Sequence, residues 1–257
     1  NTLTFQADEI DLDFYHSDGF QKDAKKIRGS VMLIAPLLAR FGRASLPKPG
    51  GDKIGRRRLD THLLGFQKLG AKFKYEGEKF FLEAKKLKGT YLLMDEISVT
   101  GTANVVMAAA LAKGTTTIYN AACEPYLQQL CRMLNEMGAK ISGIGSNLLT
   151  VEGVDEMGGT KHRILPDMIE IGSFIGLAAL TNSDIRIKNA AVKELGNILP
   201  VFEKFGLKIN IEGDDIHIPQ QGIYEISTFR RMPSEEERKG RVDDEGLMVW
   251  RDNEWGT

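Results

Sequence analysis

The segment Leu69-Gly70-Ala71-Lys72 recurs as Met137-Gly138-Ala139-Lys140 and as Phe205-Gly206-Leu207-Lys208, with 68 residues between successive copies. In each copy an amphipathic stretch leads into the glycine, and an alternating apolar run follows it, over residues 73–82, 141–151 and 209–218. A glycine after a periodic apolar stretch is a helix C-cap signal, and alternation indicates strand. The sequence therefore predicts a structural unit that is repeated along the chain.

A second repeated motif supports this period. Asn120-Ala121-Ala122 recurs 69 residues later as Asn189-Ala190-Ala191, and each copy follows a β-rich stretch, 115–119 or 185–188. One unit then reads strand, helix, strand, helix, strand, strand, which predicts an α/β (α+β) fold built by duplication. The predicted helices cover residues 29–40, 59–69, 102–112, 124–137, 171–179 and 191–205.

Composition narrows the functional class. The 257 residues carry a formal net charge of -1, which argues against a general nucleic-acid binder. The chain has two cysteines and shows no metal-ligand spacing, disulfide framework, signal peptide or long apolar run. We therefore expect a cytoplasmic protein with no membrane partner, no metal and no other cofactor.

Residues 50–60, Gly-Gly-Asp-Lys-Ile-Gly-Arg-Arg-Arg-Leu-Asp, concentrate glycines and cations after a proline-rich turn. Glycines allow close approach of the backbone to a ligand, and guanidinium groups suit phosphate oxygens. We interpret this segment as a phosphate-facing loop with Asp52 as a candidate catalytic acid. The alternative is that Asp52 is an ordinary turn residue after two glycines.

With these features in place, the chain resembles the enolpyruvyl transferases, over about residues 1–220. Five blocks carry the resemblance: Ala35-Pro36-Leu37-Leu38-Ala39-Arg40-Phe41-Gly42, the loop at 50–62, Met94-Asp95-Glu96-Ile97-Ser98-Val99, Ala121-Ala122-Cys123-Glu124-Pro125 and Leu165-Pro166-Asp167-Met168-Ile169-Glu170-Ile171-Gly172. The resemblance implies two similar domains, each with three βαβαββ units that have helices inside and sheets outside, and substrates bound between the domains. Residues 1–228 would form most of one domain without its first segment, and residues 229–257 a charged tail of unknown role.

The resemblance is greatest to the branch of the family that acts on UDP-N-acetylglucosamine. It implies transfer of the enolpyruvyl group of phosphoenolpyruvate to the sugar 3-hydroxyl, the first committed step of peptidoglycan precursor synthesis. A non-catalytic fragment or UDP-sugar-binding module of the same fold is one alternative. A shikimate-pathway enolpyruvyl transferase is another, which the loop and the block at 94–99 disfavour.

Site residues follow from the resemblance by position. Asp52 lies where most members have cysteine and some have aspartate, so it would be the proton donor, and the enzyme would resist the thiol-alkylating antibiotic fosfomycin. The expected substrate contacts are Arg28, Arg57, Arg58, Leu59, Asp60, Thr61, Glu96, Ile97, Ser98 and Val99, and possible supporting residues are Glu124, Asp167 and His62.

Some of these assignments have competing interpretations. Arg28 could be a solvated cation, Asp167 a helix cap, and His62 an orienting or structural residue. Glu96 stands where many relatives have lysine, so its carboxylate would repel a diphosphate unless it turns outward. The resemblance also implies further catalytic groups in a second domain, so a missing domain or another chain would be needed to complete the cleft.

Overall fold

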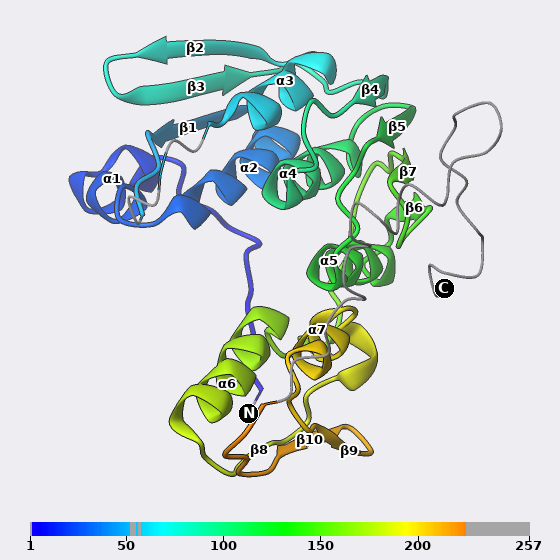
Figure 1. Ribbon diagram of the computed structural model, residues 1–257. Helices are drawn as coiled ribbons and strands as arrows, with labels where there is room; N and C mark the ends of the chain where they lie inside the picture. Colours follow the sequence, from blue (N-terminus) through cyan, green and yellow to red (C-terminus); the bar gives the residue numbers. More distant parts are fainter. Residues whose placement is uncertain (1, 52–54, 56–57, 225–257) are drawn as a thin grey trace, which may run out of the picture. The chain divides into compact units, whose positions relative to one another are not determined.

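A computed structural model describes residues 2–51, 55 and 58–224, and their contacts divide the chain into two compact units, Asn1–Leu165 and Pro166–Thr257. The expected domain over residues 1–228 stays a prediction, and within it the contacts divide between residues 165 and 166. The described chain has no helix or strand between residues 153 and 167, and this irregular link separates the two sets of contacts. Each unit is described by itself below (Figure 1).

Unit 1, Asn1–Leu165, holds two sheets and most of the helices. Its elements in order are η1 (Phe14–His16), α1 (Asp18–Ala24), η2 (Arg28–Leu33), α2 (Ile34–Phe41), β1 (Arg43–Pro47), α3 (Asp60–Lys68), β2 (Lys72–Glu76), β3 (Lys79–Glu83), β4 (Tyr91–Leu93), α4 (Val99–Ala109), β5 (Thr115–Tyr119), α5 (Pro125–Glu136), β6 (Lys140–Ser142) and β7 (Leu148–Glu152). Unit 2, Pro166–Thr257, contains α6 (Met168–Thr181), β8 (Ile185–Ile187), η3 (Val192–Glu194), α7 (Ile198–Lys204), β9 (Asn210–Glu212) and β10 (Asp215–Ile218).

The three repeated glycines end three helices in the same way. Gly70, Gly138 and Gly206 follow α3, α5 and α7 with φ of 97°, 107° and 84°, values that favour glycine over any residue with a Cβ. In each copy the amide two residues past the C-cap returns to the last turn, as in the bond from the Ala71 amide to the Phe66 carbonyl at 3.0 Å. This is the Schellman arrangement, and the predicted caps are confirmed.

Sheet topology repeats with the same period. The three sheets have the orders β1-β3-β2, β4-β5-β7-β6 and β8-β10-β9. In each sheet, the strand that follows a helix (β1, β5 or β8) pairs with the second strand of a later β-hairpin. Residues 91–152 form one complete strand, helix, strand, helix, strand, strand unit, in which β4 pairs parallel with β5. The predicted duplicated α/β fold is confirmed.

Helix α4 is the centre of unit 1. Eight of its residues are buried, and they are distributed around the whole helix. This is expected of a helix that is surrounded by other elements. Buried and more exposed side chains alternate along the strands of the β4–β7 sheet. Leu92, Ile118 and Val151 point to this core, and the residues between them face outward. Figure 1 shows the helices α2, α3 and α4 beside the two sheets of the unit. Unit 1 therefore has helices inside and sheet faces outside.

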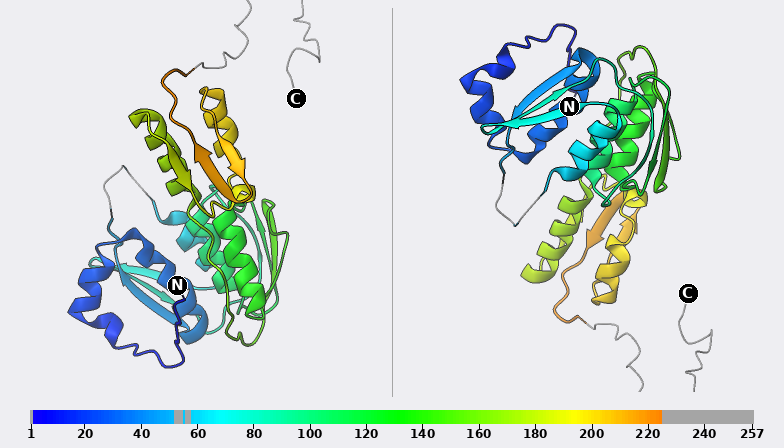
Figure 2. Two further views of the ribbon diagram at one scale, coloured as in Figure 1. Left: turned by 90° about the horizontal axis from the view of Figure 1, so that it is seen from below. Right: turned by 90° about the horizontal axis from the view of Figure 1, so that it is seen from above.

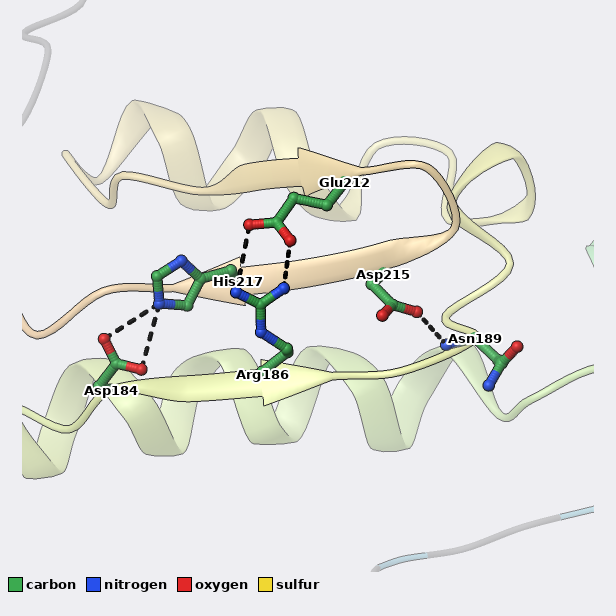
Figure 3. A network of polar contacts seen from close by, with 6 residues as sticks. All are labelled: Asp184, Arg186, Asn189, Glu212, Asp215 and His217. Atoms are coloured by element: carbon green, nitrogen blue, oxygen red, sulfur yellow. Dashed lines mark hydrogen bonds and ion pairs between the residues drawn. The ribbon is translucent and has the colours of Figure 1, made fainter.

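Unit 2 has a small core of its own, formed by α6, α7 and the inner face of its sheet; Figure 2 shows these elements together. Ile216 and Ile218 of β10 point into this core. On the opposite face, Arg186 pairs with Glu212, and His217 contacts Asp184 at 3.0 Å (Figure 3). The Asn189 amide donates to Asp215 at 2.8 Å and closes the turn after β8. The polar contacts hold the three short strands in register on their solvent side.

Several predicted element boundaries shift, and caps explain most of the shifts. Helix α4 starts three residues earlier than predicted because the Ser98 hydroxyl accepts the Gly101 amide at 3.1 Å. Helix α6 likewise starts early, after Asp167. The predicted helix at 191–205 is interrupted at Gly196, with φ of 52°, and becomes η3 and α7. The predicted helix at 29–40 divides into η2 and α2. Among the described residues, no helix combines the length and apolar character needed to cross a membrane.

Candidate functional site

Two of the predicted substrate-binding segments meet at the N-terminal ends of α3 and α4. Thr61, in the first turn of α3, donates its hydroxyl to Asp95 Oδ1 over 2.7 Å. A Cβ on Gly101, in the first turn of α4, would lie 3.0 Å from Thr61 Cγ2. Segments 58–61 and 95–99 are therefore in direct contact, as two parts of one binding surface must be.

Arg28 brings a third segment to the same place. It begins η2, and its Nη2 donates to the Arg58 carbonyl over 2.9 Å. Arg58 Nε in turn contacts the Asp60 carboxylate. Arg28 is half-buried and its guanidinium is bonded to the backbone that leads into α3, and its role as a substrate contact stays a prediction.

Ser98 anchors the start of α4. Its hydroxyl accepts the Gly101 amide, and its carbonyl accepts the Thr102 hydroxyl over 2.7 Å. Thr102 Oγ1 also accepts the Ala122 amide over 3.1 Å, which ties the loop after β5 to α4. The Ser98 hydroxyl hydrogen is not used by the Gly101 contact, so it can still be donated to an anion.

His62 lies beneath this surface. It is 2% exposed, and its Nδ1 is 2.8 Å from Asn104 Nδ2, while its Nε2 is 3.4 Å from the Thr100 hydroxyl. Burial, with a smaller contribution from the positive charge of Arg28, lowers the pKa of His62 to about 4. His62 is thus a neutral residue that supports the site from below and does not form part of its surface.

The remaining predicted residues are placed differently. Glu96 and Ile97 are exposed beside Ser98, and Val99 is half-buried at the helix start. Glu124 is the N-cap residue of α5, and its Oε2 is buried without a hydrogen-bond partner. Asp167 belongs to unit 2, where its carboxylate accepts the Ile169 amide at 2.8 Å as the cap of α6. Asp52 and Arg57 lie outside the described residues.

This surface carries groups of both charges. The helix ends at Asp60 and Val99 present the positive ends of two helix dipoles, and α3 has no side-chain cap on its first amides. Arg28 and Arg58 add two guanidinium groups, against the carboxylates of Asp60, Asp95 and Glu96. The carboxylates suit hydroxyl or amide donors, so the surface combines groups for phosphates with acceptors for a sugar or base.

Sequence reasoning missed two residues that organise the site, Asp95 as the partner of Thr61 and Asn104 as the partner of His62. Asn104 carries a signal of its own, because it is a single amide within the apolar run Ala103-Asn104-Val105-Val106. A polar residue at such a position needs a partner. Its partner His62 is 42 residues away, and no periodicity identifies that pairing.

Elsewhere in unit 1, a cavity of about 1570 Å³ lies near the C-terminal ends of α2 and α4. Its lining includes Arg40, Arg43, Lys85, Lys113 and Glu156, and none of the predicted site residues. In the described part of the chain, no group of three or more His, Cys, Asp or Glu side chains could hold a metal ion.

Comparison with known proteins places the chain in a family. A family profile described as EPSP synthase (3-phosphoshikimate 1-carboxyvinyltransferase) matches residues 13–231. The chain is 62% identical over 231 residues to a UDP-N-acetylglucosamine 1-carboxyvinyltransferase of Bacteroides thetaiotaomicron, covering 89% of this chain and 53% of that protein. A protein of the same name from Porphyromonas gingivalis is 57% identical over 231 residues, with the same two coverages. The chain thus spans about half the length of these relatives.

Solved structures agree at the level of fold. The enolpyruvyl transferase NikO from Streptomyces tendae matches with a TM-score of 0.64 at 20% identity, covering 75% of this chain and 47% of that one. EPSP synthase from Acinetobacter baumannii matches with a TM-score of 0.55 at 20% identity, covering 74% of this chain and 45% of that one. Because the family profile matches most of this chain, the chain belongs to the EPSP synthase family of enolpyruvyl transferases.

Proposed function

We propose that this chain provides the nucleotide-sugar-binding part of an enzyme that transfers the enolpyruvyl group of phosphoenolpyruvate to the 3-hydroxyl of UDP-N-acetylglucosamine. The names of its relatives support the reaction. The observation that carries the proposal is the contact between Thr61 and Asp95, because it joins the two segments expected to hold one substrate. A UDP-sugar has a diphosphate, a ribose and a base, which match the amides, arginines and carboxylates gathered there.

In this proposal each group has a distinct task. Arg28 and the first amides of α3 hold the diphosphate, with Ser98 as a hydroxyl donor at the start of α4. Asp60 accepts from the base or ribose, at the expense of its contact with Arg58. Glu96 is exposed, and we propose that it turns away from the phosphates so that the arginines carry the affinity. Leu59, Thr61, Ile97 and Val99 shape the backbone of the pocket.

The transfer itself needs further groups. The sugar hydroxyl gives its proton to a base, its oxygen bonds to the central carbon of phosphoenolpyruvate, and the methylene carbon gains a proton. Loss of that proton and departure of phosphate then restore the double bond. We assign the proton donor to Asp52 and an anion contact to Arg57, both outside the described residues. Glu124 and Asp167 act at most in support.

We further propose that the base and the remaining phosphate-binding groups come from a second domain or another chain, since relatives are about twice as long. In this arrangement the two units described above are both parts of the family fold. Because Asp52 has a carboxyl group in place of a thiol, we also propose that fosfomycin does not inactivate the enzyme.

A phosphate-release assay with phosphoenolpyruvate and UDP-N-acetylglucosamine, run on the full-length enzyme in which the second domain or partner chain completes the cleft, tests the transfer. Release that disappears in Asp52→Asn but persists in Asp155→Asn, a carboxyl variant at the cavity outside the candidate site, supports it. Binding of the UDP-sugar without release supports a non-catalytic binding module. If phosphate is released with shikimate 3-phosphate in place of the UDP-sugar, the protein belongs instead to the shikimate branch of the family.

A further inference from the structure

Asn104 makes contacts that no part of the proposed reaction explains. It lies in the middle of α4 and is 0% exposed. Its amide nitrogen is 3.2 Å from the Val31 carbonyl and 2.8 Å from His62 Nδ1. One side chain therefore joins three elements, because Val31 belongs to η2 and His62 to α3.

Each of those three elements begins with a residue proposed to contact the substrate. Element η2 starts at Arg28, α3 starts at Asp60 and Thr61, and α4 is capped by Ser98. All three lie within one or two turns of the Asn104 amide. A shift of any element against the others would move its first residue relative to the rest of the binding surface.

The hydrogen-bonding chemistry determines how this junction is arranged. The Val31 carbonyl can only accept, so the amide group of Asn104 must turn its nitrogen toward it. The second hydrogen of that nitrogen then points to His62 Nδ1, which must be the unprotonated nitrogen of a neutral ring. The His62 proton lies on Nε2, on the side of Thr100.

The junction is costly for the fold. Asn104 Oδ1 is buried and has no hydrogen-bond partner, and a buried unsatisfied acceptor destabilises the folded state. An apolar side chain of similar size would avoid that cost and fill the space between helices, but it would leave the Val31 carbonyl and His62 Nδ1 without the donor that Asn104 supplies. A polar residue here therefore favours one mutual arrangement of the three elements over others that pack equally well.

We propose that Asn104 is a positioning residue for the UDP-sugar site, which fixes Arg28, Thr61 and Ser98 relative to one another through its bonds to Val31 and His62. The inference rests on the proposed function. It adds a residue that touches no substrate and acts only through the three elements it joins.

Asn135 offers a matched control. It is also a helical asparagine, it is half-buried in α5, and it makes two backbone bonds, accepting the Ile141 amide at 2.8 Å and donating to the Ile141 carbonyl at 2.9 Å. Both of its bonds go to Ile141 of β6, and it takes no part in the bonds that join Asn104 to Val31 and His62. A loss of general stability would therefore appear in variants of both asparagines.

The experiment compares Asn104→Leu and Asn135→Leu in the full chain, with Asn104→Ala as a second variant in case leucine does not fit. Calorimetric titration should show that UDP-N-acetylglucosamine binds at least tenfold more weakly to the Asn104 variants, and within twofold of wild type to Asn135→Leu. Equal losses in both sets, or no loss in the Asn104 variants, would overturn the inference.

Amide hydrogen exchange in the absence of ligand separates this inference from the proposed function. In the Asn104 variants, we expect the exchange rates of the amides at residues 28–33, 60–63 and 98–101 all to rise at least tenfold. In Asn135→Leu, we expect these rates to stay as in wild type. If wild type does not bind the UDP-sugar but exchange changes as expected, the proposed function fails and the structural junction stands. If exchange in these segments matches wild type, the inference fails whatever the ligand does.

Discussion

Thr61 and Asp95 are 34 residues apart in the sequence and share a hydrogen bond of 2.7 Å between hydroxyl and carboxylate. Thr61 is 5% exposed and Asp95 is exposed, so the bond runs from the protein interior to its surface. Together they set the distance between the segment that leads into α3 and the loop that leads into α4. The binding surface proposed here depends on that distance.

Replacement of Thr61 by valine keeps the shape of the side chain and removes this bond. A hydrogen bond to a charged group is worth about 1.5–3 kcal/mol, but exposure of Asp95 lets water replace part of it. We therefore expect UDP-N-acetylglucosamine to bind about five- to tenfold more weakly, as measured by calorimetric titration. Thr150→Val, on the outer face of β7, is the control and should bind like wild type. Unchanged affinity in Thr61→Val would show that the two segments act independently.

His62 should make stability depend on pH. Its pKa is about 4 in the folded chain against 6.5 as the ordinary value, so the unfolded chain takes up a proton first as pH falls. The stability present above pH 6.5 should decrease by about 3 kcal/mol as pH falls to 4, since each pH unit is worth about 1.4 kcal/mol. Denaturant unfolding of wild type and His62→Gln across this range isolates the effect from that of the carboxylates. Parallel curves for the two proteins would contradict a buried neutral histidine.

The crossing of α3 and α4 depends on Gly65. A Cβ at this position would lie 2.3 Å from Val105 Cγ2, and Val105 is fully buried. We expect Gly65→Ala to lower the free energy of unfolding by about 1–3 kcal/mol, because the helices must separate. Val105→Ala should restore part of the loss in the double variant. Gly19→Ala in α1 has no atom near its new Cβ and should be neutral or slightly stabilising. A neutral Gly65→Ala would mean that the helices can move apart freely.

Variants of Asp167 show whether this residue caps α6 or contacts the substrate. As the cap of α6, its removal in Asp167→Ala should cost about 1 kcal/mol of stability, and Asp167→Asn should retain most of it. Affinity for the UDP-sugar should stay within twofold of wild type in both variants. Thermal unfolding and titration of the same samples provide the two readouts. A large loss of affinity with unchanged stability would return Asp167 to the binding site.

Much of the fold could be predicted because local chemistry repeats. Gly70, Gly138 and Gly206 are required by three helix ends with positive φ, and Asn120 and Asn189 occupy the equivalent turn with φ of 60° and 52°. Such positions depend on a few neighbouring residues, so the sequence shows them directly. The positions of strands β1 and β4 were not predicted, because pairing with distant strands, such as that of Tyr91 with Thr117, determines them.

The candidate site was predictable only through the family resemblance. That resemblance named Arg28, Thr61 and Ser98 separately, but no sequence pattern places their segments together. The bonds from Thr61 to Asp95 and from His62 to Asn104 join residues 34 and 42 positions apart, and tertiary packing alone determines them. The motifs at residues 165–172 continue the sequence resemblance across the boundary between the two units, so no sequence signal marks this division of contacts.

Titration of the wild-type chain and of Arg28→Ala with UDP-N-acetylglucosamine measures whether the surface at Arg28, Thr61 and Ser98 binds the UDP-sugar. We predict saturable binding at one site for wild type and at least tenfold weaker binding for Arg28→Ala. Arg132→Ala, which removes an exposed arginine paired with Gln128 on α5, should bind as wild type does. No saturable heat at millimolar ligand, or equal binding by wild type and Arg28→Ala, would contradict the proposed site.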